Sequence, residues 1–260
     1  MNKFLLKVLV LASVNIAVFA DAQFRTRNRM DKLEDFDQQV FSWGFYLNGN
    51  MLDYRIVLHP RYGMAGNQNL VTSKESFSFG AGLIGKWRLN DYLDLRVEPG
   101  LQFAQRQLTF NTQANDFYKE GSLTNPPFTP IPLTENDKVR DIKSTLVDVP
   151  VLLELHGERW YNSRPYVAAG VNYVVNLQSN SGSEDDNLQQ VFRSTTHNFA
   201  WSAEMGIQFY FNKFKLTPAI RGTFFMNNEK VADNATTPPY WSSAISTIQT
   251  RAVMFVLKFE

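Results

Sequence analysis

The sequence predicts an all-β protein, an eight-stranded antiparallel up-and-down transmembrane β-barrel with short periplasmic turns and long extracellular loops. Three observations predict this fold. Apolar and polar residues alternate through eight segments of about ten residues. Short and long connections alternate between these segments, and aromatic residues gather near both ends of them.

Residues 1–22 have the features of a secretory signal peptide. Lys3 and Lys7 make a positive start, Val8–Phe19 is mostly apolar, and a small-x-small cleavage signal follows at residues 20–22. The apolar run is too short for a membrane helix, and no later run of about 18 apolar residues exists. We therefore expect an exported chain without a transmembrane helix.

Residues 23–38 follow as a charged leader, which we expect in the periplasm. Arginines are concentrated in the first half of this leader and acidic residues in the second half. The leader is expected to be either mobile or docked at the periphery of the barrel. The barrel itself is predicted to occupy residues 39–260.

Segment Leu93–Phe103 shows the strand pattern most clearly. Every odd position is apolar and every even position is polar or small, which is the two-residue period of a strand. Pro99 lacks a backbone N–H for the ladder, so it predicts a bulge or a local break in pairing. The eight predicted strands are Phe41–Leu47, Phe77–Trp87, Leu93–Phe103, Val147–Leu155, Val167–Val175, Phe199–Phe209, Leu216–Phe224 and Val253–Phe259.

The connections between these strands alternate in length. The short turns are Leu89–Tyr92, Gly157–Ser163 and Phe211–Phe214. The long loops are expected at Met51–Ser76, Asn111–Val139, Gln178–Asn198 and Asn227–Ser246. Four long loops would be unusual in a compact soluble domain, whereas strict alternation of short and long connections is typical of a bacterial outer-membrane barrel.

Alternation alone does not say which face of the sheet is buried, since a soluble β-sandwich also alternates. The glycines fall on the polar face, where they suit the narrow interior of an eight-stranded barrel. Aromatic residues near both strand ends are typical of the two membrane interfaces. A lipid-facing apolar surface is therefore favoured, with residues such as Leu93, Val97 and Leu101 outward, and a secreted sandwich is the alternative.

Eight charged residues of both signs fall on the polar face and are expected in the barrel interior. They are Lys86, Arg88, Arg96, Glu98, Asp148, Glu154, Glu204 and Arg221. Eight strands leave room for side chains but not for an aqueous channel. We therefore interpret these charges as a structural, salt-bridged plug, and a proton or ion relay is the alternative.

The composition excludes several function classes. The net charge of +1 shows no basic excess for nucleic acid. The absence of cysteine removes disulfides, thiolate zinc sites and cysteine nucleophiles. No metal-ligand spacing and no glycine-rich phosphate loop are present, so neither a metal nor a cofactor is expected.

Histidines raise the question of catalysis. His59 and His197 fall in different long loops on the same side of the barrel, and Ser194 with Asp185 or Asp186 could complete a triad. No G-x-S-x-G or other nucleophile context surrounds these residues. The sequence therefore predicts a protein that is not an enzyme and has no catalytic residues.

Two long loops contain proline-rich segments with exposed apolar candidates for partner binding. One reads TNPPFTPIP and contains Phe128 and Ile131, and the other reads NATTPPYW and ends with Tyr240 and Trp241. Proline lowers the entropy lost when a loop becomes ordered, and aromatic residues make good binding anchors. Packing of the same side chains on the barrel rim is the alternative.

Several stretches resemble the PorT family of the Bacteroidetes. The opening FDQQVFSWGFYLNGNMLDYRI at residues 36–56 is similar to the start of these barrels. WRLNDYLDLRVEPGLQFAQR at residues 87–106 is the most specific match, and DVPVLLEL at residues 148–155 and the final LKFE also fit. The resemblance runs from about Phe36 to the C-terminus.

The resemblance implies an outer-membrane component of the type IX secretion system, which exports cargo and, in gliding species, surface adhesins. It implies other secretion-machinery proteins and outer-membrane lipid as partners, and it supplies no catalytic residues. We expect such a barrel to assemble or hold partners rather than to act as the pore. A lipid-modifying outer-membrane enzyme and a small adhesin barrel are the alternatives.

Overall fold

The computed structural model describes residues 32–33, 35–60, 64–65, 68–110, 138–183, 192–232 and 242–260. The chain divides into two units, Met1–Lys32 and Leu33–Glu260, and every element described below belongs to the second. The predicted signal peptide and most of the predicted leader lie outside the described residues.

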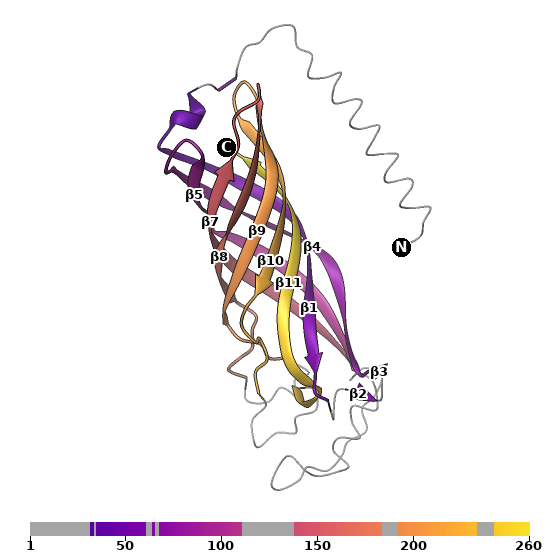
Figure 1. Ribbon diagram of the computed structural model, residues 1–260. Helices are drawn as coiled ribbons and strands as arrows, with labels where there is room; N and C mark the ends of the chain where they lie inside the picture. Colours follow the sequence, from indigo (N-terminus) through magenta and orange to yellow (C-terminus); the bar gives the residue numbers. More distant parts are fainter. Residues whose placement is uncertain are drawn as a thin grey trace, which may run out of the picture. The chain divides into compact units, whose positions relative to one another are not determined.

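One sheet closes on itself into an antiparallel barrel (Figure 1). Its strands are β1 (Phe41–Leu58), β4 (Val71–Arg88), β5 (Leu93–Val97), β6 (Gly100–Phe110), β7 (Val139–His156), β8 (Ser163–Asn176), β9 (His197–Tyr210), β10 (Lys215–Phe225) and β11 (Ile245–Phe259). Since β5 and β6 both pair with β4 and β7, they are two halves of one strand. Pairing of β1 with both β4 and β11 closes a ring of eight strands, which confirms the predicted fold.

Four short elements accompany the barrel. The 3-10 helix η1 (Phe36–Gln38) precedes β1, the strands β2 (Met64–Ala65) and β3 (Gln68–Asn69) pair with each other, and η3 (Ser242–Ala244) precedes β11. Figure 1 places η1, the short turns and the C-terminus at one end of the barrel and β2 and β3 at the other. None of the helices in the described ranges is long and apolar enough to cross a membrane.

Several strands run further than the apolar pattern predicts. β1 continues past Met51 and β4 begins at Val71, so most of the loop predicted at Met51–Ser76 is strand instead. The outward residues after Met51 include Asp53 and Arg55, so the apolar alternation stops while the backbone ladder continues. A bilayer is crossed by about 9–11 strand residues, and a strand of 18 residues such as β1 extends beyond it.

Side chains alternate between the lumen and the outer surface. In β9, Trp201 and Met205 are 45% and 62% exposed, whereas Ser202 and Glu204 between them are buried. The same alternation on the other strands covers the outer wall with large apolar side chains. An apolar outer band around a polar interior is what a transmembrane barrel requires, because lipid surrounds it.

Pro99 produces a local break in pairing rather than a bulge. β5 ends at Val97 and β6 begins at Gly100, and both halves keep one register with β7: Val97 opposes Val151 and Gly100 opposes Asp148. The Pro99 carbonyl still accepts the N–H of Leu83 at 2.9 Å. The missing N–H of the proline therefore interrupts the ladder without shifting it.

Glycines in the wall make room for two tyrosine rings in the lumen. A Cβ on Gly100 would lie 2.1 Å from the Tyr46 hydroxyl oxygen, and one on Gly82 would lie 2.5 Å from the same ring. A Cβ on Gly206 would lie 2.8 Å from the Tyr166 ring. The placement of glycine on the polar face thus reflects close approach of large side chains inside a narrow barrel.

The long-loop end of the lumen holds an apolar cluster. Its buried members are Tyr54, Val71, Leu108, Phe110, Ile142, Ala244, Ile245 and Ile248. Val71 reaches this cluster because the register of β4 with β6 shifts between Glu75 and Gly80, which changes the side of the wall that odd-numbered residues face. The lumen at this end is therefore filled by hydrocarbon rather than by water.

Candidate functional site

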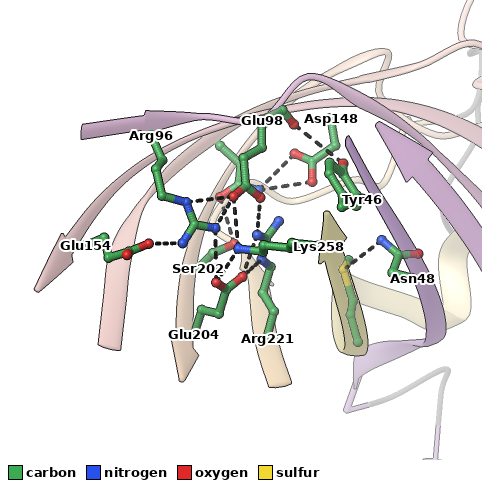
Figure 2. Close-up of polar contacts among 12 residues, drawn as sticks. Tyr46, Asn48, Arg96, Glu98, Asp148, Glu154, Ser202, Glu204, Arg221 and Lys258 are labelled. Carbon is green, nitrogen blue, oxygen red and sulfur yellow. Dashed lines mark hydrogen bonds and ion pairs between the residues drawn. The ribbon is translucent and has the colours of Figure 1, made fainter. Parts of the chain in front are cut away.

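Six charged side chains meet in the middle of the lumen (Figure 2). They are Arg96 of β5, Glu98 between β5 and β6, Glu154 of β7, Glu204 of β9, Arg221 of β10 and Lys258 of β11. We call these six residues the central cluster. Each is at most 4% exposed, and its three cations balance its three carboxylates, so the cluster carries no net charge.

Two carboxylates organise the central cluster, because each contacts all three cations. Lys258 Nζ lies 2.9 Å from Glu98 Oε1 and 2.5 Å from Glu204 Oε1. Arg221 donates to Glu98 and, through Nε at 2.7 Å, to Glu204. Arg96 donates to Glu98 through Nε at 2.9 Å and lies 3.2 Å from Glu204 through Nη2. Buried charges are stable only when paired in this way.

Neutral side chains add further hydrogen bonds to two of the carboxylates, Glu154 and Glu204. Glu154 accepts from Arg96 and from Gln208 Nε2 at 2.5 Å. The hydroxyl of Tyr166 donates to Glu204 Oε1 at 2.6 Å. The strand register helps to position these groups, since Arg221 stands directly opposite Glu204 on neighbouring strands.

Lys258 is the member of the central cluster that the sequence analysis missed. Its signal was present, because Leu257 and Phe259 flank it as outward residues in the last strand, which places Lys258 on the lumen face. The five members of the central cluster that were predicted are two cations and three carboxylates. Lys258 supplies the third cation.

Asp148 lies outside the central cluster and is held by neutral groups. Asn172 Nδ2 donates to its two carboxylate oxygens at 2.9 and 3.2 Å. Ser202 in turn donates to Asn172 Oδ1 at 2.7 Å, and Ser202 and Thr223 share a hydrogen bond of 2.7 Å. This polar chain of residues from β7, β8, β9 and β10 continues the packed interior beside the charges.

Arg88 was predicted in the interior, and the structure places it elsewhere. Its side chain is 31% exposed, pairs with Asp91 in the short turn and donates to the carbonyl of Gln38 at 3.4 Å. β4 ends at Arg88, so the wall that would enclose the side chain is absent there. Lys86, two residues earlier, is buried and lies 3.4 Å from Asp94.

A second group of charges closes the short-turn end of the barrel. Lys215 Nζ pairs with Glu260 Oε2 at 2.5 Å, and the ring of Phe36 lies 5.0 Å from Lys215 Nζ and 5.9 Å from Lys86 Nζ. Burial alone raises the pKa of Glu260, but the charges of Lys215, Lys86 and Arg96 outweigh burial and lower this pKa to about 2.

The end of the predicted leader docks at the same opening. Asp37 of η1 accepts a hydrogen bond of 2.8 Å from the Tyr210 hydroxyl. Its carboxylate also lies 3.6 Å from Arg159 and 3.7 Å from Arg164 in ion pairs. The leader is therefore attached to the barrel at this opening through η1.

A third polar group lies between the central cluster and the apolar cluster of the long-loop end. Arg106 donates to Thr250 Oγ1 at 2.7 Å and to Ser144 Oγ at 3.0 Å, and its guanidinium carbon stacks 3.9 Å from the Tyr54 ring centre. Thr250 Oγ1 donates to Glu229 at 3.0 Å. Burial raises the pKa of Glu229, and the nearby charge of Arg106 only partly offsets this.

Side chains therefore fill the lumen at four successive levels, from Phe36 at the short-turn end to the apolar cluster at the long-loop end. The carboxylates of the central cluster are held by several donors each, which leaves little freedom for a mobile proton or ion. The arrangement suits a rigid, closed barrel.

The residues of the imagined triad do not come together where they are described. His197 Nδ1 lies 2.7 Å from the Tyr173 hydroxyl and stacks on its ring. Ser194 Oγ accepts from Asn176 at 3.1 Å and donates to the Ser179 carbonyl at 3.5 Å. His59 lies just after β1, and the two aspartates at 185 and 186 lie outside the described residues.

The four residues predicted for partner binding lie outside the described residues. They are Phe128, Ile131, Tyr240 and Trp241. Exposed aromatic residues that the sequence analysis did not select lie in the short turn between β7 and β8. Trp160 is 74% and Tyr161 53% exposed, with ring centres 6.0 Å apart.

Solved structures of other outer-membrane proteins match this chain at low sequence identity. The outer membrane protein OprG from Pseudomonas aeruginosa is 13% identical over 85% of this chain and 95% of its own, with a TM-score of 0.38. Neisserial surface protein A is 10% identical over 85% and 98%, with a TM-score of 0.37. AlkL is 13% identical over 84% and 87%, with a TM-score of 0.39. No curated protein matches the sequence.

The sequence also matches a family described as "Outer membrane protein beta-barrel domain" over residues 21–230. This match covers most of the chain and includes all strands except β11. The closed ring of eight strands, the apolar outer wall and the polar, packed lumen are what such a domain needs in its membrane. The chain thus belongs to the outer membrane protein beta-barrel domain family and is a protein of the outer membrane.

Proposed function

We propose that this barrel is a non-enzymatic component of the type IX protein secretion machinery and acts by assembling or holding partners rather than as the pore. The observation that carries the second half of the proposal is the filled lumen, with a neutral central cluster in which each charged side chain contacts one of opposite sign. A pathway for cargo needs an open interior, so a closed barrel contributes to export through its surfaces.

The resemblance of residues 36–56, 87–106 and 148–155 to the PorT family supports the choice of machinery. Residues 87–106 contain Arg96 and Glu98, which connect β5 to the other strands across the lumen. The most specific stretch of the resemblance therefore coincides with residues that hold the barrel closed.

The periplasmic end offers a partner surface among the described residues. Trp160 and Tyr161 project from a short turn next to Arg159 and Arg164, which hold Asp37 of the leader. Exposed aromatic and arginine side chains are the residues most often found at the energetic centres of protein interfaces. This surface is where we expect a periplasmic component of the machinery to bind.

Deletion of the gene is the first test. We expect cargo to accumulate in the periplasm while the outer membrane stays sealed to small dyes, because the barrel is not itself a pore. Secretion at the normal level in the deletion strain would contradict a role in the type IX machinery.

Replacement of both Trp160 and Tyr161 by serine tests the periplasmic surface. We expect reduced secretion with the barrel still present in the membrane, since both rings are exposed and support no buried packing. Trp43→Ser is the matched control, because Trp43 is 73% exposed on the lipid-facing wall of β1. An equal defect in both variants would show that loss of an exposed aromatic residue, not a partner contact, causes it.

A further inference from the structure

The barrel wall has a gap in its hydrogen-bond ladder between β4 and β6. Glu75 pairs with Arg106, and the next pair is Gly80 with Gln102. Four residues of β4, Ser76–Phe79, thus stand opposite three residues of β6, Phe103–Gln105. The extra residue in β4 separates the two strands locally, as a β-bulge does.

A groove of about 350 Å³ lies at this gap. Its base is made of small side chains that face the lumen: Ser78, Ala104 and Ser144. Behind Ser144 the guanidinium of Arg106 donates to its hydroxyl at 3.0 Å. The groove therefore enters the wall from outside and ends at the packed interior. It has the shape of a binding site and does not lead into a channel through the barrel.

The two sides of the groove differ in polarity. Phe77, Phe79 and Phe103 line one side, and the rings of Phe79 and Phe103 meet across the gap with their centres 5.0 Å apart. Lys143 and Thr145 of β7 line the opposite side, with Gln178 beside Thr145 and with Gln105 following Phe103 along β6. Among the described residues that line the groove, Lys143 is the one that carries a charge.

The groove lies at the edge of the apolar band of the outer wall. Along the outer face of β6, Leu101 and Phe103 are followed by Gln105 and Gln107, and the apolar band ends between them. Phe103, with the ring of Phe79 against it, thus lies within the apolar band. Lys143 pairs with Gln105 in the ladder and so lies just beyond this band, at the level of the headgroups of the outer leaflet. Backbone groups without ladder partners are unfavourable next to hydrocarbon, so an occupant that supplies polar atoms at this level stabilises the gap.

We propose that the groove binds an anionic amphiphile of the outer leaflet with a single alkyl chain. The chain lies against Phe77, Phe79 and Phe103, and the negatively charged headgroup pairs with Lys143, with the amides of Gln105 and Gln178 beside it. The volume is at the lower end of the range of about 300–1,000 Å³ for small-molecule sites, which suits one chain rather than a whole multi-chain lipid. The proposal is independent of the secretion role.

The test uses the whole barrel in phosphatidylcholine nanodiscs with a dodecyl phosphate that carries a photoreactive diazirine at the end of its chain. After illumination, labelled peptides are identified by mass spectrometry. We expect the label in the segments 76–79 and 103–105, and we expect unlabelled dodecyl phosphate to compete with it. Dodecyltrimethylammonium and inorganic phosphate are expected not to compete, because the first lacks the negative charge and the second lacks the chain.

Two variants make the test specific. Lys143→Glu should weaken competition by dodecyl phosphate at least tenfold, and Thr145→Trp should block labelling by filling the groove. Lys74→Glu is the matched control, because Lys74 is an exposed lysine of β4 that does not line the groove. All three side chains are outside the packed lumen, and heat-modified migration on a gel checks that each variant has folded.

Three results would overturn the proposal. Label spread evenly over the outward residues of all strands would indicate nonspecific contact with the probe. Equal weakening by Lys143→Glu and Lys74→Glu would indicate only the general surface charge. Competition by inorganic phosphate would indicate an ion site without a chain.

Discussion

Loss of one carboxylate from the central cluster should destabilise the whole barrel. Glu98 contacts Arg96, Arg221 and Lys258 and is fully buried. Glu98→Gln keeps the size of the side chain but leaves three cations facing two carboxylates. Removing one partner of a buried pair costs about 3–5 kcal/mol, which is a large part of the roughly 5–15 kcal/mol that stabilises a typical domain.

The free energy of unfolding in lipid vesicles, measured by urea titration, is the assay. Arg88→Ala is the control, because Arg88 pairs with Asp91 at the exposed strand end and such a pair contributes about 1 kcal/mol or less. Combining Glu98→Gln with Lys258→Met restores two cations to two carboxylates. The double variant should therefore be more stable than the sum of the two single changes predicts, by at least about 1 kcal/mol.

The reasoning would be refuted if Glu98→Gln cost no more than Arg88→Ala. Strict additivity of Glu98→Gln and Lys258→Met would also contradict it, since the two side chains lie 2.9 Å apart in the proposed network.

Three further changes test other parts of the structure. Gly100→Ala should cost about 1–3 kcal/mol in the same assay, because its Cβ would lie 2.1 Å from the Tyr46 hydroxyl, whereas Gly85→Ala should cost less, since the nearest atom there is 3.8 Å away. The low pKa of Glu260 means that its contribution is fully present above its ordinary pKa of 4.5 and is lost as pH falls toward about 2, so the wild type should lose stability in this window and Glu260→Gln should lose less. Replacement of both His59 and His197 by alanine should leave cargo secretion and the lipid A mass spectrum unchanged, and a new lipid A species would instead favour an enzyme.

The two-residue period accounts for most of what the sequence could predict. It identified eight strands and their outward faces, because every strand with lipid on one side must alternate. It failed where alternation does not report on the membrane. Beyond Met51 the outward residues are polar, so continued strand looks like loop.

The shift in β4 could not be seen for a related reason. The residues from Val71 to Ser76 are mostly polar on both faces, so one extra residue leaves no trace in the pattern. The groove beside Lys143 depends on this register shift, so the sequence pattern could not predict it. Arg88 has the periodicity of a lumen residue, but the pattern does not show that the wall ends at the same residue.

Conductance of the purified protein in planar lipid bilayers tests the central claim, a barrel whose lumen is closed by its own side chains. The three cations and three carboxylates of the central cluster, together with Phe36 at one end and the apolar cluster at the other, fill the interior. We predict no conductance above that of the protein-free bilayer. Stable, voltage-independent conductance steps from the wild-type protein would contradict a closed lumen and, with it, a role that depends on surfaces alone.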